Sequence, residues 1–287
     1  MAGGAVLGWV NWADTATLST TTSGSMLRPL SELQVKWARG LCRGPANGTG
    51  VDPATLVIRA DLGSSKVFHA VGLIGLNGVT YTNMTVVMST SAFGGTDAGT
   101  GGHSWDPAYG EEFGQGLFIT APNGYWTARY IQISVEVAGR GAGTRYVDAR
   151  RLLIMAGGMW ADGFDSSWDT SPTDLSVTED TPRGGTFVSE QGKHREMTIS
   201  LSGMTLTEAL NASRTYNNYD SLRAVLAGAG TSKEVVVVPR YTTDEEFRYH
   251  TAAYGRLTGW GPIRHTGGDT FACDSIKIKE TPHPPLS

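Results

Sequence analysis

The stretch VIRADLGSSKVFHAVGLIGLN, residues 57–77, decides the fold class. β-Branched and other apolar side chains dominate it, and its Asp-Leu-Gly-Ser-Ser segment at 61–65 has the composition of a turn. We therefore expect a strand, a tight turn and a second, long strand in which the apolar run from Val67 to Leu76 is buried. The stretch holds no evident nucleophile, base or metal cluster, which favours a scaffold over a catalytic site.

The composition is typical of an all-β protein with many turns. Of 287 residues, 38 are Gly, 40% are hydrophobic and 17% are charged. The low charge indicates a surface that is neutral or covered by neighbouring molecules. The net charge of −4 and the lack of a basic stripe argue against nucleic acid as a partner. We also expect no secretory signal, because such a signal begins with basic residues and Arg28 is the first basic residue here. We expect no membrane span, because the apolar runs are too short to cross a bilayer.

No set of residues in the sequence makes a convincing catalytic site. The histidines lack metal-binding spacing, the Gly-rich segments lack the context of a phosphate loop, and the acidic pairs lie in polar stretches. Asp162, Asp165 and Asp169 could wrap Ca²⁺, but their spacing differs from that of an EF-hand loop. Cys42 and Cys273 are expected to be buried free thiols of a reducing compartment. We expect no enzyme, no catalytic residue, no resident metal and no cofactor.

Strand signals are dense in the first half of the chain. The Gly-rich stretch 91–116 is instead expected to be a long loop without regular structure. Rings exposed on the loops of a β scaffold stack on sugars or anchor protein interfaces. The candidate glycan- or protein-binding residues are Trp105, Tyr109, Tyr125 and Trp126; alternatively, these rings cover the open ends of a sandwich. The expected strands are 33–37, 55–61, 66–76, 80–90, 117–120, 126–137 and 145–157.

The rest of the chain changes character twice. Residues 158–192 are acidic and rich in turn formers, and we expect a linker or subunit-contact segment there. The last third reads as α+β. Thr205 with Glu208 three residues later has the spacing of a helix start, and the apolar residues of 219–230 share one helical face. Strands are expected before the first helix, at EVVVV, and in the two final apolar segments.

Two stretches of the first half resemble the galactose-binding-like (discoidin) jelly roll. In that family a strand ending in Asp-Leu-Gly introduces a long apolar strand, and a later Arg-Tyr-Ile-x-Ile strand packs opposite it. The resemblance covers roughly residues 10–157 and implies a jelly-roll sandwich over 1–157. The matching residues are Asp61, Leu62, Gly63, Arg129, Tyr130, Ile131 and Ile133.

The order of segments also looks like that of tailed-bacteriophage tail-tip or baseplate proteins of the distal-tail type. Such proteins carry a discoidin-like domain, then segments like RYVDARRLLIM (145–155), MWADGFDSSWD (159–169) and RGGTFVSEQGKHREMTISLSGMTLTEAL (183–210). The resemblance implies a mainly β chain with three parts. These are the jelly roll at 1–157, the linker or contact segment at 158–192, and a smaller tail-tube-like α+β domain, a β-sandwich with a flanking helix, at 193–287.

The second resemblance implies a structural component of a phage tail tip or baseplate that forms a ring at the distal end of the tail. Its partners would be copies of itself and the tube, hub and tape-measure proteins. It would be located in the virion after synthesis in the host bacterial cytoplasm. The alternative is a carbohydrate-binding module that recognises a host-surface glycan through the four aromatic residues. A glycosidase with an appended jelly roll is a third hypothesis, and the lack of an acid/base pair argues against it.

Overall fold

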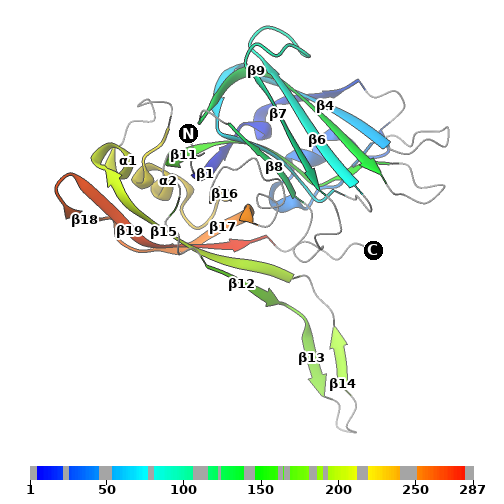
Figure 1. The fold of residues 1–287 in the computed structure, drawn as a ribbon. Coiled ribbons are helices and arrows are strands. Elements are labelled where there is room, and N and C mark those ends of the chain that lie inside the picture. Colours follow the sequence, from blue (N-terminus) through cyan, green and yellow to red (C-terminus); the bar gives the residue numbers. More distant parts are fainter. Residues whose placement is uncertain are drawn as a thin grey trace.

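The computed structural model shows a mainly β protein built on two large sheets (Figure 1). A five-stranded sheet packs against one end of a ten-stranded sheet, and two short helices pack at the other end. The predicted fold class, mainly β with a sandwich in the N-terminal half, is confirmed. The structure describes residues 5–21, 26–44, 54–76, 81–105, 116–121, 124–138, 146–160, 164, 169–180, 186–189, 193–211, 219–239 and 251–281.

The five-stranded sheet forms one layer of the N-terminal sandwich. Along its central strand, Ile131, Ile133 and Val135 are fully buried, and the residues between them lie on the more exposed face. This alternation confirms the strand predicted at 126–137. The order of the sheet is β2 (Thr17–Thr20), β4 (Ala54–Phe68), β9 (Trp126–Ala138), β6 (Tyr81–Ser89) and β7 (Gly99–Trp105).

The ten-stranded sheet runs through the whole chain. Its first strand, β1, pairs with β11 on one side and with β16 on the other. This sheet contains strands from all three parts into which the sequence analysis divides the chain. The division into domains at 158–192 stays a prediction. The order is β12 (Asp169–Asp174), β15 (Lys193–Thr205), β19 (Thr270–Glu280), β17 (Ala253–Trp260), β16 (Glu234–Val238), β1 (Ala5–Asn11), β11 (Arg151–Trp160), β5 (Ala70–Ile74) and β8 (Gly116–Thr120), with β18 (Arg264–Gly267) beside β19.

Separate hydrophobic clusters fill the two ends of the molecule. One lies between the sheets and joins Ile58 of β4 and Ile133 of β9 to Leu73 of β5 and Ile154 of β11. Another lies between the second half of the large sheet and the helices α1 (Leu206–Leu210) and α2 (Leu222–Ala229). Each large apolar side chain buried in this way stabilises the fold by roughly 1.5–3 kcal/mol.

Both helices that the sequence predicts in the last third are present, as α1 and α2. Thr205 and Glu208 form a capping box at α1, in which each side chain hydrogen-bonds to the backbone N–H of the other residue. At the start of α2 the Ser221 hydroxyl accepts a hydrogen bond from the N–H of Ala224, and Gly230 follows the last turn with a φ of 54°. No helix of the described residues is long and apolar enough to cross a membrane.

The turn predicted at 61–65 is a bulge within one continuous strand. Asp61 and Lys66 both pair with β9, and only the residues between them leave the ladder. Gly63 has a φ of 75°, and its N–H donates to the Asp61 carboxylate at 2.8 Å. The prediction of two strands separated here is therefore wrong, because both flanks pair with the same neighbour. The break between strands comes at His69, between β4 and β5.

The strand predicted at 33–37 is wrong. These residues belong to two short 3₁₀ helices, η2 (Leu30–Gln34) and η3 (Lys36–Ala38). Of the alternating apolar positions, Leu33 is fully buried whereas Val35 is exposed, so these residues share no apolar strand face. Trp37 also has a φ of 62°, which a strand does not allow.

Part of the loop predicted at 91–116 is a strand. β7 pairs with β6 along its whole length, and residues 106–115 lie outside the described residues. Glycine is required in this strand for close packing. A Cβ on Gly101 would lie 2.5 Å from Ile119, and one on Gly99 would lie 2.9 Å from the Trp126 ring. The many glycines of this stretch favour a loop in the sequence. In the structure they belong to a strand, where their lack of a side chain leaves room for the side chains packed against it.

The predicted buried thiols are confirmed. Cys42 and Cys273 are both buried and free, and burial raises the pKa of Cys42 to about 12. Asp162 and Asp165 lie outside the described residues, and Asp169 begins the edge strand β12. No cluster that could hold a metal ion is found among the residues that the structure describes.

Candidate functional site

The acidic segment 158–192 forms the edge of the large sheet and then leaves it. β12 pairs with β15, from Asp169 opposite Thr198 to Asp174 opposite Lys193. The next strands, β13 (Val177–Asp180) and β14 (Thr186–Ser189), pair with each other and with no other described strand. Figure 1 shows this hairpin extending well beyond the body of the molecule. We call β13 and β14 the arm.

An arm of this kind needs a partner to be stable. An isolated two-stranded hairpin is at best marginally stable in water, because it buries little apolar surface. The arm nevertheless has a fixed register, with Val177 opposite Ser189 and Asp180 opposite Thr186. A protein surface that covers one face of the arm would supply the missing burial.

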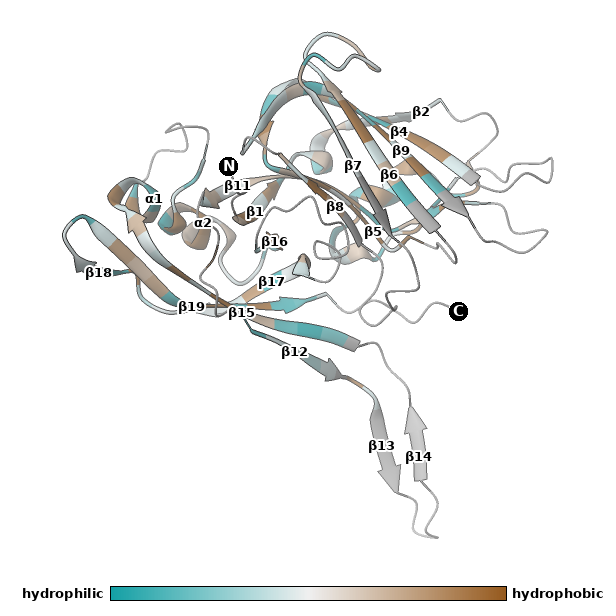
Figure 2. Cartoon of the chain, in the orientation of Figure 1, coloured by the Kyte–Doolittle hydropathy of each residue, from teal (hydrophilic) through white to brown (hydrophobic). Residues whose placement is uncertain are grey.

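The strand that leads into the arm has an open edge. β12 is the outermost strand of the large sheet in the described part of the chain, and the side chains of Asp169 to Pro172 are exposed. Figure 2 shows the adjoining part of β15 as mostly hydrophilic. Asp residues and a proline are common on edge strands, where they limit unspecific pairing. The edge remains available to a specific partner.

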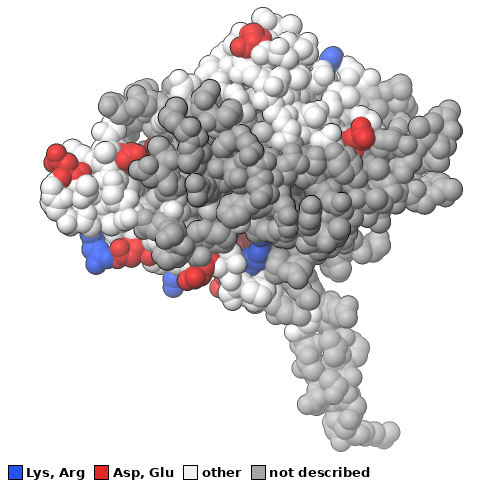
Figure 3. All heavy atoms as spheres, viewed as in Figure 1, with Lys and Arg blue, Asp and Glu red and all other residues white. Residues whose placement is uncertain are grey.

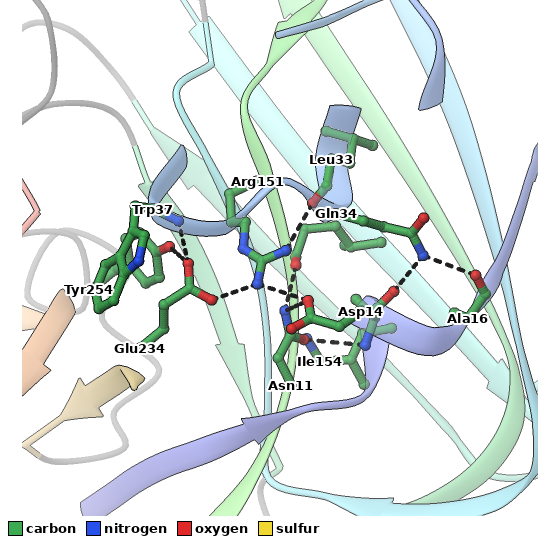
Figure 4. Close-up of polar contacts among 12 residues, drawn as sticks. Asn11, Asp14, Ala16, Leu33, Gln34, Trp37, Arg151, Ile154, Glu234 and Tyr254 are labelled. Atoms are coloured by element: carbon green, nitrogen blue, oxygen red, sulfur yellow. Dashed lines mark hydrogen bonds and ion pairs between the residues drawn. The ribbon is translucent and has the colours of Figure 1, made fainter. Parts of the chain in front are cut away.

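A buried charged network ties the N-terminal sandwich to the second half (Figure 4). Its centre is Arg151 of β11, whose side chain is fully buried. Nη2 of Arg151 lies 2.5 Å from Glu234 of β16 and 2.7 Å from Asp14 of η1 (Trp12–Thr15). Nη1 donates to the Leu33 carbonyl at 3.3 Å. One guanidinium therefore holds two elements of the first half to a strand of the second. We call this network the clamp.

The second oxygen of Glu234 extends the clamp. It accepts hydrogen bonds from the hydroxyl of Tyr254 and, at 2.5 Å, from the backbone N–H of Trp37. Burial raises the pKa of Tyr254, and the neighbouring Glu234 raises it further, so the hydroxyl stays protonated and donates. Burial by itself lowers the pKa of the Arg151 guanidinium. The negative charges of Glu234 and then Asp14 raise it by more, so the pKa of Arg151 is raised overall. The arrangement is structural.

The clamp was not predicted from the sequence. Arg151 and Glu234 lie far apart in the chain, on either side of β1, and no local pattern links them. One signal was present in the sequence: Glu234 begins a strand whose remaining residues are all Val. A carboxylate at a fully buried position requires a partner, and the candidates are the buried arginines.

The structure describes the side chains of two of the four predicted aromatic residues, Tyr125 and Trp126, and these two lie in different surroundings. Trp126 is only 5% exposed, and its ring centre lies 5.7 Å from that of Phe68, in the core between the sheets. It belongs to the core because it begins β9 on the inward-facing side. Trp105 ends β7, but its side chain is outside the description, as is the whole of Tyr109.

Tyr125 is the one predicted ring that the structure shows on the surface. It is 39% exposed, and its ring meets that of Tyr219 edge to face, with centres 5.8 Å apart. Tyr219 in turn lies 5.2 Å from the ring of His69, which is buried. Tyr219 and His69 were not among the predicted residues, because they come from segments distant in sequence. Ligand binding by Tyr125 stays a prediction.

No family model and no curated protein sequence matches the chain. Similar solved structures include the family 32 CBM from C. perfringens NanJ in complex with galactose, at 15% identity over 52% of this chain and 99% of that one, with a TM-score of 0.36. Chitosan-binding module 1 from a Paenibacillus sp. IK-5 chitosanase/glucanase is 20% identical over 53% and 98%, with a TM-score of 0.35. The f-lectin of Morone saxatilis serum is 8% identical over 97% and 99%, with a TM-score of 0.37. At these values the likenesses assign no function to the chain.

Proposed function

We propose that the chain is a structural subunit that assembles with copies of itself, as a component of a phage tail tip or baseplate. The observation that carries the assembly is the arm, which leaves the body and pairs with no other described strand. The phage assignment, the location in the virion and the tail partners rest on the resemblance of sequence segments. The similar solved structures named above are not phage proteins.

The proposed mechanism is a head-to-tail contact. The arm of one subunit lies on the surface of the next, and the open edge of β12 lies beside it. Contacts of this kind use two different surfaces, so they close into a ring when the rotation between subunits allows it. Closure requires a fixed angle between the arm and the body. The clamp around Arg151 and the unbroken ten-stranded sheet supply that rigidity.

The test compares the mass in solution of the full chain with that of a variant whose residues 176–190 are replaced by a short Gly-Ser linker. We expect the full chain to form an oligomer of defined mass as concentration rises, and the variant to remain monomeric with the same melting temperature. Equal oligomers in both would show that the arm is dispensable. A full chain that is monomeric alone and with tail proteins would contradict the proposal.

A second candidate function is glycan binding, and the exposed Tyr125–Tyr219 pair favours it. Aromatic rings at the end of a sandwich stack on the apolar faces of sugars. Galactose and chitosan oligosaccharides, named for two of the similar structures, are suitable first probes. We expect Tyr125→Ala to abolish any binding, while Trp260→Ala, which removes a similarly exposed ring from β17, leaves it unchanged. Equal binding by both variants would exclude this site.

A further inference from the structure

A basic pocket opens between the two halves of the molecule, next to the clamp. Its volume is about 780 Å³, within the range of small-molecule sites. The walls come from η3 and the residue after it, from the residue that precedes β11, and from β17 and β19. Leu175 at the base of the arm closes one side. The charged or aromatic residues in the walls are Trp37, Arg39, Arg150, Arg256, Lys279 and Glu280.

The arginines of the pocket lack an acidic partner among the described residues. In that part of the chain, no carboxylate forms an ion pair with Arg39, Arg150 or Arg256. The acid in the described wall, Glu280, is engaged with Arg195 at 2.6 Å. The pocket is therefore positive in a chain whose net charge is −4.

The register of the sheet places two of these cations side by side. Arg256 of β17 is directly opposite Lys279 of β19, so their side chains lie on the same face. An acidic residue lies on each side of this pair, Glu234 opposite Arg256 and Glu196 opposite Lys279, and each already contacts a cation. Glu234 belongs to the clamp, and Glu196 contacts Lys279 at 3.8 Å from an exposed position. Like charges directly opposite each other destabilise a sheet. Glu196 offsets part of this repulsion at Lys279, and an anion bound between Arg256 and Lys279 would offset the rest. Figure 3 shows basic and acidic side chains interleaved on the underside of the molecule, in the region of β15 and β19.

The rim of the pocket is held in an unusual backbone conformation. Trp37 and Ala38 have φ values of 62° and 50°, and they are the only described residues other than glycine with positive φ. The N–H of Trp37 donates to Glu234, which fixes this strained turn to the clamp. Backbone strain of this kind persists where the surrounding structure enforces it, and it concentrates at binding sites. The rim is thus built on a rigid support.

We propose that this pocket binds a small molecule that carries two or more carboxylate, phosphate or sulfate groups. The planar guanidinium of an arginine pairs with such groups through two parallel hydrogen bonds. Three arginines without an acidic partner among the described residues, Arg39, Arg150 and Arg256, line this pocket. One anionic group would lie between Arg256 and Lys279, and a second would be within the walls formed by Arg39 and Arg150. A concave site of this size suits a compact ligand better than an extended chain. The inference does not depend on the proposed assembly.

The test is calorimetric titration of the full chain with citrate, inorganic pyrophosphate and inorganic sulfate. We expect one-to-one binding of citrate or pyrophosphate, with an affinity that falls as salt is added, and weaker binding of sulfate, which carries a single anionic group. The double variant Arg150→Gln/Arg256→Gln should lose at least tenfold in affinity, and Arg39→Gln provides a second, exposed position if the double variant folds poorly. Arg264→Gln is the matched control, because Arg264 is an exposed arginine of β18 outside the pocket.

Two results would overturn the proposal. One is the absence of binding by any of the three anions at low salt, or equal binding by the pocket variants and the control. The other is loss of oligomers in the double variant with no anion binding by the wild type. That second result would assign the pocket to an acidic segment of a neighbouring subunit, such as the Glu179–Asp180 stretch of its arm.

Discussion

At the scale of single residues, the clamp gives the sharpest prediction for stability. Glu234→Gln removes the charge that compensates the buried guanidinium of Arg151. Removing one partner of a buried ion pair leaves an uncompensated charge, and we expect the free energy of unfolding to fall by about 3–5 kcal/mol. Chemical denaturation followed by circular dichroism measures the change.

The matched control is Glu196→Gln. Glu196 also contacts a cation, Lys279, but at 3.8 Å and from a position that is 55% exposed. A pair in water contributes only about 0–1 kcal/mol, so this variant should be close to the wild type. Similar losses in both variants would mean that Glu234 acts by a route other than charge compensation.

Asp97 supplies a prediction about pH. Hydrogen bonds from Ser89 and then Thr90 lower the pKa of its carboxyl from 3.8 to about 2. A lowered pKa in the folded state means that the ionised form stabilises the fold above pH 3.8, and that this contribution is lost as the pH falls toward 2. We expect Asp97→Ala to be less stable than the wild type at about pH 6, with the difference shrinking by about pH 2. A difference that stays constant across this range would contradict the assignment.

At the scale of elements, β1 should couple the two halves in unfolding. Gly157 of β11 faces β1 so closely that a Cβ would lie 2.2 Å from the Leu7 carbonyl oxygen. Gly157→Ala should therefore disturb the pairing between β1 and β11 and destabilise both halves together. Differential scanning calorimetry should show one transition moved to lower temperature. Gly259→Ala is the control, since no atom lies within 4 Å of the added carbon; a split transition in Gly157→Ala would show that the halves unfold separately.

The sequence predicted the elements that have a regular apolar pattern. Strand β9 alternates strictly, and the capping box of α1 is a local signal, so both were predicted correctly. The errors have physical causes in contacts that no local pattern contains. Strand β7 is rich in glycine because Ile119 and Trp126 pack against it. Residues 61–65 have turn composition, but the long partner β9 keeps both flanks in one strand.

The candidate sites were harder to predict than the strands. Trp126 adjoins a turn, which favours a surface position, but the direction of its side chain depends on the register of β9. The arm lies in the segment predicted to be a linker or a subunit contact, and no local pattern there predicts its hairpin. The basic pocket and the clamp combine residues from elements that meet only in the folded chain.

At the scale of the whole molecule, the features described above favour a rigid body with one projecting element. A single sheet connects the sandwich to the helical end, and the clamp locks the junction between them. The arm is the exception, because it lacks described contacts beyond its own two strands that would hold it in place. Its geometry is understandable if the protein works as part of a larger assembly.

Electron cryomicroscopy of the assembled protein would show directly whether the arm joins neighbouring subunits. We predict closed rings in which the arm of each subunit, residues 177–189, lies against the body of its neighbour. The position of the arm in the density decides the matter. Rings or other oligomers in which the arm extends freely into solvent, with no protein against either of its faces, would contradict the account.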